Sequence, residues 1–355
     1  MRVSIVVIAL LVAVSTAAPF DQHEQAAEPV LPCTARGPQP GAPLVNWHAG
    51  PIDDAEALDR WCRGVGRPIV TSSAQVATEN PPALDQLVVL TWNAHLAEGR
   101  LSDLINQLRA GALTGGRPVR HFVLLLQELF RRGSDVPRFA GDVRSAFAIK
   151  ARDPDSPDAN QYAAGLGLSF IYVPSMRNGP ELQEDRGNAI VSSEPLIDPV
   201  ALELPFERQR RVAIGASVRV RTRAGIETLN VFDVHLEPLS SPSSLWIFRN
   251  PRRRQVASVL DLLRQPRFTR GAGTVLGGDF NTIQGGVEEG AYLQARAWST
   301  SLVDEDGRST HYMGRLDYLF FRLGQHVAAT TRLEERFGSD HYPVLGRFTA
   351  ALGSR

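Results

Sequence analysis

The chain has 355 residues, with 38 basic and 38 acidic side chains, a formal net charge of zero and 43% apolar residues. A chain of this length can bury a substantial core, as one large domain or two modest ones. A net charge of zero argues against a protein that coats nucleic acid non-specifically, because such binding relies on an excess of basic residues. The apolar content excludes a wholly disordered chain.

The N-terminus has the pattern of a secretory signal peptide. Arg2 precedes an apolar run from Val3 to Val14, and small residues suited to cleavage follow up to Ala18. The run is shorter than the roughly 20 apolar residues that span a bilayer. We therefore expect residues 1–18 to be cleaved and the mature protein to be exported, to the periplasm or the extracellular space.

Residues 19–84 are rich in Pro, Gly, Ala and Gln, with one short helix-like piece over 53–63. We interpret this segment as a leader that wraps the following domain, or as a partly disordered tether. An exported chain meets an oxidising environment, so Cys33 and Cys62 are expected to form a disulfide that ties the leader. Closing about 30 residues would contribute roughly 3–4 kcal/mol in the loop-entropy description. A buried, unpaired cysteine pair is the alternative.

From residue 85 to 355 we expect a single domain of mixed strands and helices. The fully apolar run Phe122 to Leu126 is typical of a strand covered on both faces. The candidates from 168 to 236 have the alternation and turn signals of an antiparallel sheet edge, after a polar loop near 152–161. The pattern predicts an α/β protein with two stacked sheets and helices outside. Strands are expected at 87–92, 122–126, 168–173, 188–191, 212–220, 228–236, 274–276, 316–321, 326–331 and 342–347, and helices at 101–108 and 254–263.

Six polar clusters stand where these strand candidates end. Taken singly, Glu128 could cap a turn, His235 could be a satisfied core histidine, and Asp317 could pair with an arginine. It is improbable that such residues occur independently at six strand ends in this order, so we predict one common site. The clusters are Trp92-Asn93-Ala94-His95, Leu126-Gln127-Glu128-Leu129, Asp233-Val234-His235-Leu236-Glu237-Pro238, Gly277-Gly278-Asp279-Phe280-Asn281-Thr282, Arg315-Leu316-Asp317-Tyr318-Leu319-Phe320 and Gly338-Ser339-Asp340-His341-Tyr342-Pro343-Val344.

This ordered set resembles the endonuclease/exonuclease/phosphatase superfamily, which has the DNase I-like fold. The resemblance covers about residues 87–348, and its most specific pieces are Gly-Asp-Phe-Asn at 278–281 and Ser-Asp-His-Tyr-Pro at 339–343. It implies a four-layered α-β-β-α sandwich of two stacked mixed sheets with outer helices. It also implies a catalytic domain over 85–355 that hydrolyses phosphoric esters with a divalent metal.

Residue by residue, the resemblance implies that Glu128 is the principal carboxylate ligand of the metal, with Asn93 beside it and Asp340 contributing. A few hard oxygen ligands suit Mg²⁺ or Mn²⁺, which keep waters and accept phosphate oxygens as further ligands.

The same resemblance assigns the catalytic groups. His341 resembles the catalytic histidine and Asp317 the carboxylate that orients it, and such a pair fixes the tautomer and stabilises the imidazolium. Asp279 and Asn281 resemble the pair that positions the attacking water and holds the phosphate. His235 resembles the second histidine, which hydrogen-bonds the phosphate or its leaving oxygen.

Three further positions are less specific. Arg186 matches an arginine that contacts phosphate in many family members, although an ion pair with Asp185 or Glu184 is the alternative. Thr310 is similar to a family threonine ahead of the Asp-Tyr strand. His95 stands where some apurinic endonucleases carry Asp, which leaves a second metal site unsupported.

Three substrate classes compete: nucleic acids, phospholipid headgroups and small phosphate esters. The arginine runs at 208–211 and 249–254 could line a nucleic-acid backbone. Trp246 and Phe248, beside the second run, could contact a membrane peripherally. Alternatively, the apolar residues pack under the next helix and the arginines are solvated.

The sequence therefore predicts an exported phosphodiesterase of the nuclease type. A phospholipase C-like, sphingomyelinase-like or lipid-remodelling hydrolase is the first alternative, and an inactive binding module of the same fold is the second. No obligate protein partner is inferred.

Overall fold

The computed structural model describes residues 45–49, 55–72, 80–138, 156–177, 183–238, 251–282 and 289–351, all of which belong to the unit Leu31–Arg355. The expected signal peptide, Cys33, Trp246 and Phe248 lie outside the described residues. No helix within these ranges is long and apolar enough to cross a bilayer.

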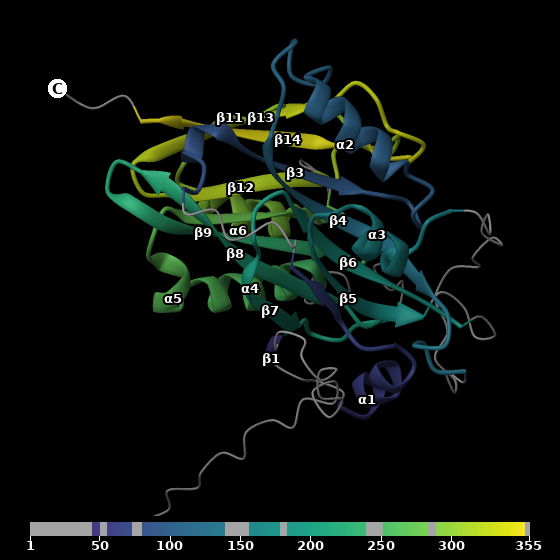
Figure 1. Ribbon diagram of the computed structural model, residues 1–355. Helices are drawn as coiled ribbons and strands as arrows, with labels where there is room; N and C mark the ends of the chain where they lie inside the picture. Colours follow the sequence, from purple (N-terminus) through teal and green to yellow (C-terminus); the bar gives the residue numbers. More distant parts are fainter. Residues whose placement is uncertain are drawn as a thin grey trace, which may run out of the picture. The chain divides into compact units, whose positions relative to one another are not determined.

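The described strands form two mixed sheets (Figure 1). The eight-stranded sheet has the order β11 (Leu302–Asp304), β13 (His326–Arg332), β14 (Val344–Ala350), β3 (Leu87–Asn93), β4 (His121–Arg132), β6 (Glu184–Ser192), β5 (Ser169–Arg177) and β2 (Ile69–Thr71). The six-stranded sheet has the order β1 (Asn46–Ala49), β7 (Ile197–Glu203), β8 (Val212–Thr222), β9 (Gly225–His235), β10 (Gly273–Asp279) and β12 (Asp317–Leu323). Parallel pairs at β3/β4 and β9/β10 stand among antiparallel ones.

Seven helical segments accompany the sheets in the described part of the chain. They are α1 (Ala55–Arg63), the 3-10 helix η1 (Leu84–Gln86), α2 (Leu101–Ala110), α3 (Ala159–Gly165), α4 (Pro251–Leu263), α5 (Pro266–Thr269) and α6 (Gly290–Trp298). In α2 the buried residues recur at helical spacing, and Gly111 ends the helix with a φ of 83°, the left-handed conformation that glycine adopts at no steric cost.

Three apolar clusters define four layers. One cluster lies between the sheets and joins residues such as Val123 and Leu125 of β4 to Val231 of β9 and Val275 of β10. A second packs the other face of the eight-stranded sheet, including Leu124, against α2 and α3. A third packs the six-stranded sheet against α4, α5 and α6. The predicted α-β-β-α sandwich is therefore confirmed.

The alternation along β4 explains its continuous apolar sequence. Val123 and Leu125 point into the cluster between the sheets, whereas Phe122, Leu124 and Leu126 point toward the helices. Because successive side chains of a strand face opposite sides, a strand covered on both faces needs apolar residues at every position.

Several expectations need correction. Residues 122–126 are only the first half of β4, which continues through Gln127 and Glu128 to Arg132. The expected antiparallel edge is wrong for β8 and β9, which lie inside the six-stranded sheet. Helix α3 forms at the end of the expected polar loop, because Asp158 and Gln161 cap its first turn reciprocally. The sequence pattern also gave no indication of β7, β11 or α6.

The described part of the leader contributes to both sheets. Strand β1 pairs with β7 and β2 pairs with β5, and Trp61 of α1 packs against Met176. The backbone N–H of Gly66 donates to the buried carboxylate of Asp185 (2.7 Å). Cys62 is buried on α1, but its expected partner is outside the described residues, so the disulfide stays a prediction.

Candidate active site

Strand register brings the predicted residues together at one edge of the sandwich. In the six-stranded sheet, Asp279 at the end of β10 pairs with His235 of β9 on one side and Asp317 of β12 on the other. In the eight-stranded sheet, Asn93 at the end of β3 pairs with Gln127 of β4. Polar clusters that are far apart in the sequence thus form a single site.

A glycine sets the spacing between β9 and β10 at this edge. Gly278 has a φ of 144°, and a Cβ atom there would lie 1.9 Å from the carbonyl oxygen of Val234. No other residue fits, because any side chain would push the strands apart. The glycine therefore holds Asp279 beside His235.

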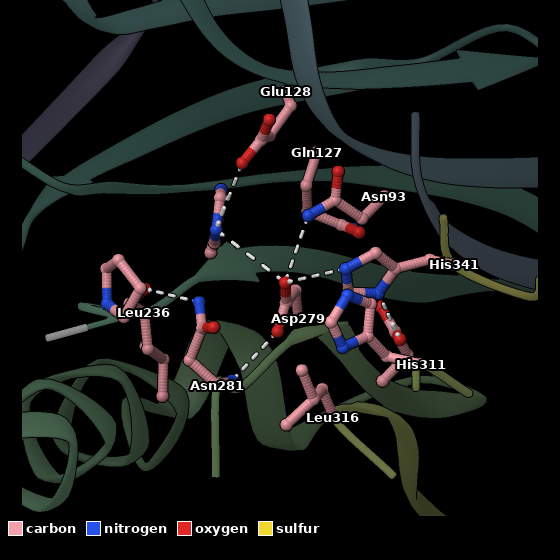
Figure 2. A network of polar contacts seen from close by, with 12 residues as sticks. Asn93, Gln127, Glu128, Leu236, Asp279, Asn281, His311, Leu316 and His341 are labelled. Carbon is pink, nitrogen blue, oxygen red and sulfur yellow. Dashed lines mark hydrogen bonds and ion pairs between the residues drawn. The ribbon is translucent and has the colours of Figure 1, made fainter. Parts of the chain in front are cut away.

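Asp279 lies at the centre of the polar network (Figure 2). Its carboxylate accepts hydrogen bonds from Asn93 Nδ2 (3.0 Å) and from the backbone N–H of Asn281 (2.8 Å). Nε2 of His235 and Nε2 of His341 lie 3.7 and 3.9 Å from Oδ2. Burial, with the nearby charge of Asp317, raises the pKa of Asp279 to about 7, although His341 acts in the opposite direction.

His341 and Asp317 form the closest histidine–carboxylate pair of the site. Nδ1 of His341 lies 2.7 Å from Oδ2 of Asp317, and both side chains are buried. Burial opposes the charged imidazole, but the charge and hydrogen bond of Asp317 outweigh it and raise the pKa of His341 to about 10. The carboxylate of Asp317 thus favours the imidazolium form of His341.

Backbone contacts hold this pair in place. The Thr310 hydroxyl oxygen accepts the N–H of Leu316 (3.0 Å) and of Asp317 (3.1 Å). The Ser339 hydroxyl donates to the Asn93 carbonyl (2.6 Å) and accepts from the N–H of His341 (3.0 Å). These bonds fasten the loop before β14 to the end of β3.

Glu128 is placed by a β-bulge, not by a strand end as expected from the sequence. The register of β4 against β6 shifts between Leu126 and Leu129, and Glu128 has a φ of 59°. A left-handed conformation costs a non-glycine residue about 1–2 kcal/mol. Here it turns the carboxylate toward the site, where Oε2 accepts the N–H of Leu96 (3.2 Å) and Oε1 lies 3.8 Å from His235 Nε2.

The donor set around Glu128 fits a hard divalent cation. Glu128 offers Oε1, which faces the site without a hydrogen bond within the described ranges. Asn93 offers Oδ1, which among the described residues accepts only the N–H of His95 (2.9 Å) and keeps a second lone pair. Carboxylate and amide oxygens without sulfur ligands suit Mg²⁺ or Mn²⁺.

Asp340 also lies close to His341, with its Oδ1 3.8 Å from Nε2 of the imidazole. Its Oδ1 is 3.0 Å from His95 Nδ1, its Oδ2 is 3.3 Å from His311 Nε2, and among the described residues it contacts neither Glu128 nor Asn93. Burial would raise its pKa, but the surrounding histidines lower the pKa of Asp340 to about 2. The imidazoles of His95, His311 and His341 thus surround the carboxylate of Asp340.

Buried arginines face the same site. Arg186 on β6 is buried, while the neighbouring acids Asp185 and Glu184 pair with Arg131 and Arg132. After burial itself, Arg211 and then Arg186 lower the pKa of His235 well below its usual value, so His235 is neutral.

Arg211 was not predicted from the sequence to be a site residue. It is 3% exposed, lies near Glu128 and Asp279, and its Nε has no hydrogen-bond partner in the described part of the chain. The expected exposed rim at 208–211 is therefore wrong for Arg211 and for Arg210, which forms a buried pair with Glu203. The sequence feature that could have identified Arg211 is its position directly before β8, a buried strand that pairs with β9, the strand of His235.

His311 was also missed, although it directly follows Thr310 in the sequence. Its ring packs against that of His341, with centroids 4.6 Å apart (Figure 2). Asn281 lies beside Asp279, and its Nδ2 donates one hydrogen to the Leu236 carbonyl (3.0 Å) and keeps a second for a ligand.

The sequence profile described as the Endonuclease/Exonuclease/phosphatase family matches residues 90–341, more than half of the chain. No curated protein matches the sequence.

Similar solved structures include an endonuclease/exonuclease/phosphatase from Beutenbergia cavernae DSM 12333, with 21% identity over 75% of this chain and 72% of that chain and a TM-score of 0.49. The human Nocturnin catalytic domain with bound sulfate is 16% identical over 81% and 98%, with a TM-score of 0.44. A Staphylococcus aureus beta toxin mutant with bound magnesium ions is 13% identical over 73% and 98%, with a TM-score of 0.42. On the profile match, this chain belongs to the Endonuclease/Exonuclease/phosphatase family.

Proposed function

We propose that this chain is an exported, divalent-metal-dependent phosphodiesterase of the nuclease type. The observation that carries the proposal is the arrangement of Asp279, whose pKa is raised to about 7, with Oδ2 3.9 Å from Nε2 of His341 in the His341–Asp317 pair. Two buried arginines, Arg211 and Arg186, lie close enough to lower the pKa of the neighbouring His235. Family members are typically hydrolases that act on phosphoesters. Export rests on the signal-peptide pattern alone.

The chain's own groups can serve both ends of a phosphodiester hydrolysis. As water attacks phosphorus, Asp279 accepts its proton, since a base with a pKa near the working pH is effective. As the ester P–O bond breaks, the imidazolium of His341 donates its Nε2 proton to the leaving oxygen. No covalent intermediate with the protein is needed.

Hydrogen-bond donors surround the place where the phosphate would lie. Neutral His235, Arg186, Arg211 and the second Nδ2 hydrogen of Asn281 can donate to its oxygens, on which charge develops in the transition state. Glu128 and Asn93 would hold a Mg²⁺ or Mn²⁺ ion. When bound, such an ion polarises a phosphoryl oxygen and neutralises its charge.

The proposal can be tested with the purified mature protein and Mg²⁺ or Mn²⁺. The substrates are single-stranded and plasmid DNA, a choline phospholipid and bis(4-nitrophenyl) phosphate. We expect EDTA-sensitive cleavage of DNA, and a loss of at least about 100-fold in His341→Ala. His326→Ala is the matched control, because His326 lies at the opposite end of the β13/β14 pair from His341.

Equal activity in His341→Ala would overturn the site assignment. Turnover of phospholipid without DNA cleavage would select the lipid hydrolase instead. A folded protein without turnover on any substrate would support a binding module.

A further inference from the structure

A short turn beside the catalytic histidine displays two large apolar side chains to solvent. Within the described ranges, Tyr312 is 84% exposed and Met313 is 57% exposed, and they are the only consecutive pair among the exposed large apolar residues. The others, Ile226, Leu293 and Val303, are isolated, which is ordinary for a protein surface. Tyr312 is also the only aromatic residue in this exposed group.

The turn is held rigidly from within. The N–H of His311 donates to the Gly314 carbonyl (2.9 Å), and the N–H of Gly314 donates back to the His311 carbonyl (3.0 Å). The N–H of Met313 donates to His311 Nδ1 (3.2 Å), and the Thr310 carbonyl accepts the N–H of Tyr342 (2.8 Å). A ligand that binds the tip therefore has little ordering cost to offset.

A row of rings links the tip to the catalytic centre. The His311 ring lies 4.0 Å from the Tyr312 ring and 4.6 Å from the His341 ring, measured between centroids. The tautomer of neutral His311 is fixed, because Nδ1 accepts from Met313 and Nε2 faces Asp340. The ring of His311 thus separates Tyr312 from the catalytic imidazole. A group that binds Tyr312 would therefore be one attached directly to the reacting phosphate.

Two arginines lie over the ring of Tyr342, whose backbone N–H is bonded to the Thr310 carbonyl at the base of the turn. Tyr342, which follows His341, has the guanidinium groups of Arg332 and Arg336 over its ring, at 4.1 and 5.2 Å. Arg336 is exposed and forms no ion pair in the described part of the chain. Exposed aromatic rings combined with guanidinium groups are the combination that binds single-stranded nucleic acid, by base stacking and phosphate contact.

We propose that Tyr312 and Met313 form a subsite for an unpaired nucleobase next to the scissile phosphate. The base stacks on the exposed ring of Tyr312 and contacts Met313 at its edge, while Arg336 lies toward a flanking phosphate. This inference rests on the proposed function and names its substrate as single-stranded or locally unpaired nucleic acid. One aromatic ring and one methionine offer little area for membrane insertion, which depends on a larger buried apolar surface.

The test compares a single-stranded oligonucleotide with an oligomer of the same length and backbone that is abasic throughout. The first readout is the ratio of kcat/KM on the two oligomers. The second is the ratio of their Kd values for the inactive His341→Ala protein. Loss of stacking on an aromatic residue typically costs about 5-fold to 150-fold per base. We expect a preference for the base-carrying oligomer by a factor in this range, in kcat/KM for the wild type and in Kd for His341→Ala.

Tyr312→Ala should bring both ratios close to one, whereas Tyr312→Phe and Tyr312→Trp should keep the preference. Leu293→Ala, which removes an exposed apolar side chain on α6, is the control and should leave the ratios unchanged. Equal kcat/KM values of the wild type on the two oligomers would overturn the inference. Cleavage of both oligomers would still agree with the proposed phosphodiesterase activity.

Two other results separate the alternatives. If neither oligomer is cleaved, the nuclease proposal fails, and the Kd ratio for His341→Ala still decides whether a base subsite exists. If Tyr312→Ala leaves both ratios unchanged and weakens binding to phosphatidylcholine vesicles, the tip is a membrane contact and the inference is wrong.

Discussion

The pairing of His341 with Asp317 makes a quantitative prediction for Asp317→Asn. The substitution removes the negative charge but keeps an oxygen that can accept the Nδ1 hydrogen, so the ring should stay in place. The wild-type pKa of about 10 exceeds the ordinary value of 6.5 although burial acts against it. At about 1.4 kcal/mol for each pKa unit, the difference corresponds to about 5 kcal/mol. Asp279 and Asp340 also raise this pKa while burial lowers it, so the figure is the net result of these effects and not the share of Asp317 alone.

The measurement is an NMR titration of the histidine ring signals in EDTA-treated protein. We expect the pKa of His341 to fall by several units toward 6.5 in Asp317→Asn, and to stay near 10 in the control Asp261→Asn, which changes an exposed carboxylate of α4. Activity should fall roughly 10²-fold to 10⁴-fold, the usual contribution of a positioned proton-transfer group.

Stability should change with pH in a defined direction. The pKa of His341 is raised in the folded state. Its contribution to the free energy of unfolding is therefore fully present below pH 6.5 and is lost as the pH rises to about 10. Urea unfolding should show the advantage of wild type over Asp317→Asn shrinking across this window. An unchanged His341 titration in Asp317→Asn would refute the reasoning.

Three further substitutions test other parts of the site. Glu128→Gln should weaken Mn²⁺ binding by at least about tenfold in calorimetry, since it removes the only charged oxygen donor of the Glu128–Asn93 pair; an unchanged affinity would contradict the ligand assignment. Burial raises the pKa of Asp233 well above its usual value, so its contribution to stability declines as the pH rises above about 3.8. Asp233→Asn should therefore be more stable than wild type by about 1–3 kcal/mol in urea unfolding at pH 8 and show no gain at pH 3.5, and a less stable variant at pH 8 would count against this. Arg211→Met should raise the inhibition constant of inorganic phosphate about 10-fold to 100-fold, because a charged hydrogen-bond donor is lost; an unchanged constant would remove Arg211 from the phosphate site.

The strands were predictable because their signal is local. The apolar run at 122–126 and the alternation at 212–220 depend on which face each side chain meets, and they correspond to parts of β4 and β8. The short edge strands β1 and β2 were not predictable, since a strand of three or four residues owes its existence to the partner that it pairs with.

The site was predictable where a motif fixes the backbone. Asp279 and His341 lie in the two most specific motifs, and the packing of the two sheets brings Nε2 of His341 within 3.9 Å of the Asp279 carboxylate. His311 was not predictable as a site residue, because its contact with Asp340 joins segments 29 positions apart. The position of Arg211 likewise depends on contacts between both sheets.

The sequence by itself determined the fold class, the order of the polar clusters and the residue types that phosphoester chemistry requires. These are properties of composition, spacing and motif, which the chain carries before it folds. Only the tertiary structure decided that Glu128 reaches the site through a bulge, that Arg211 is buried beside His235, and that Tyr312 is exposed one ring away from His341. Bulges, burial and ring contacts depend on which distant segments meet, and that is settled by packing.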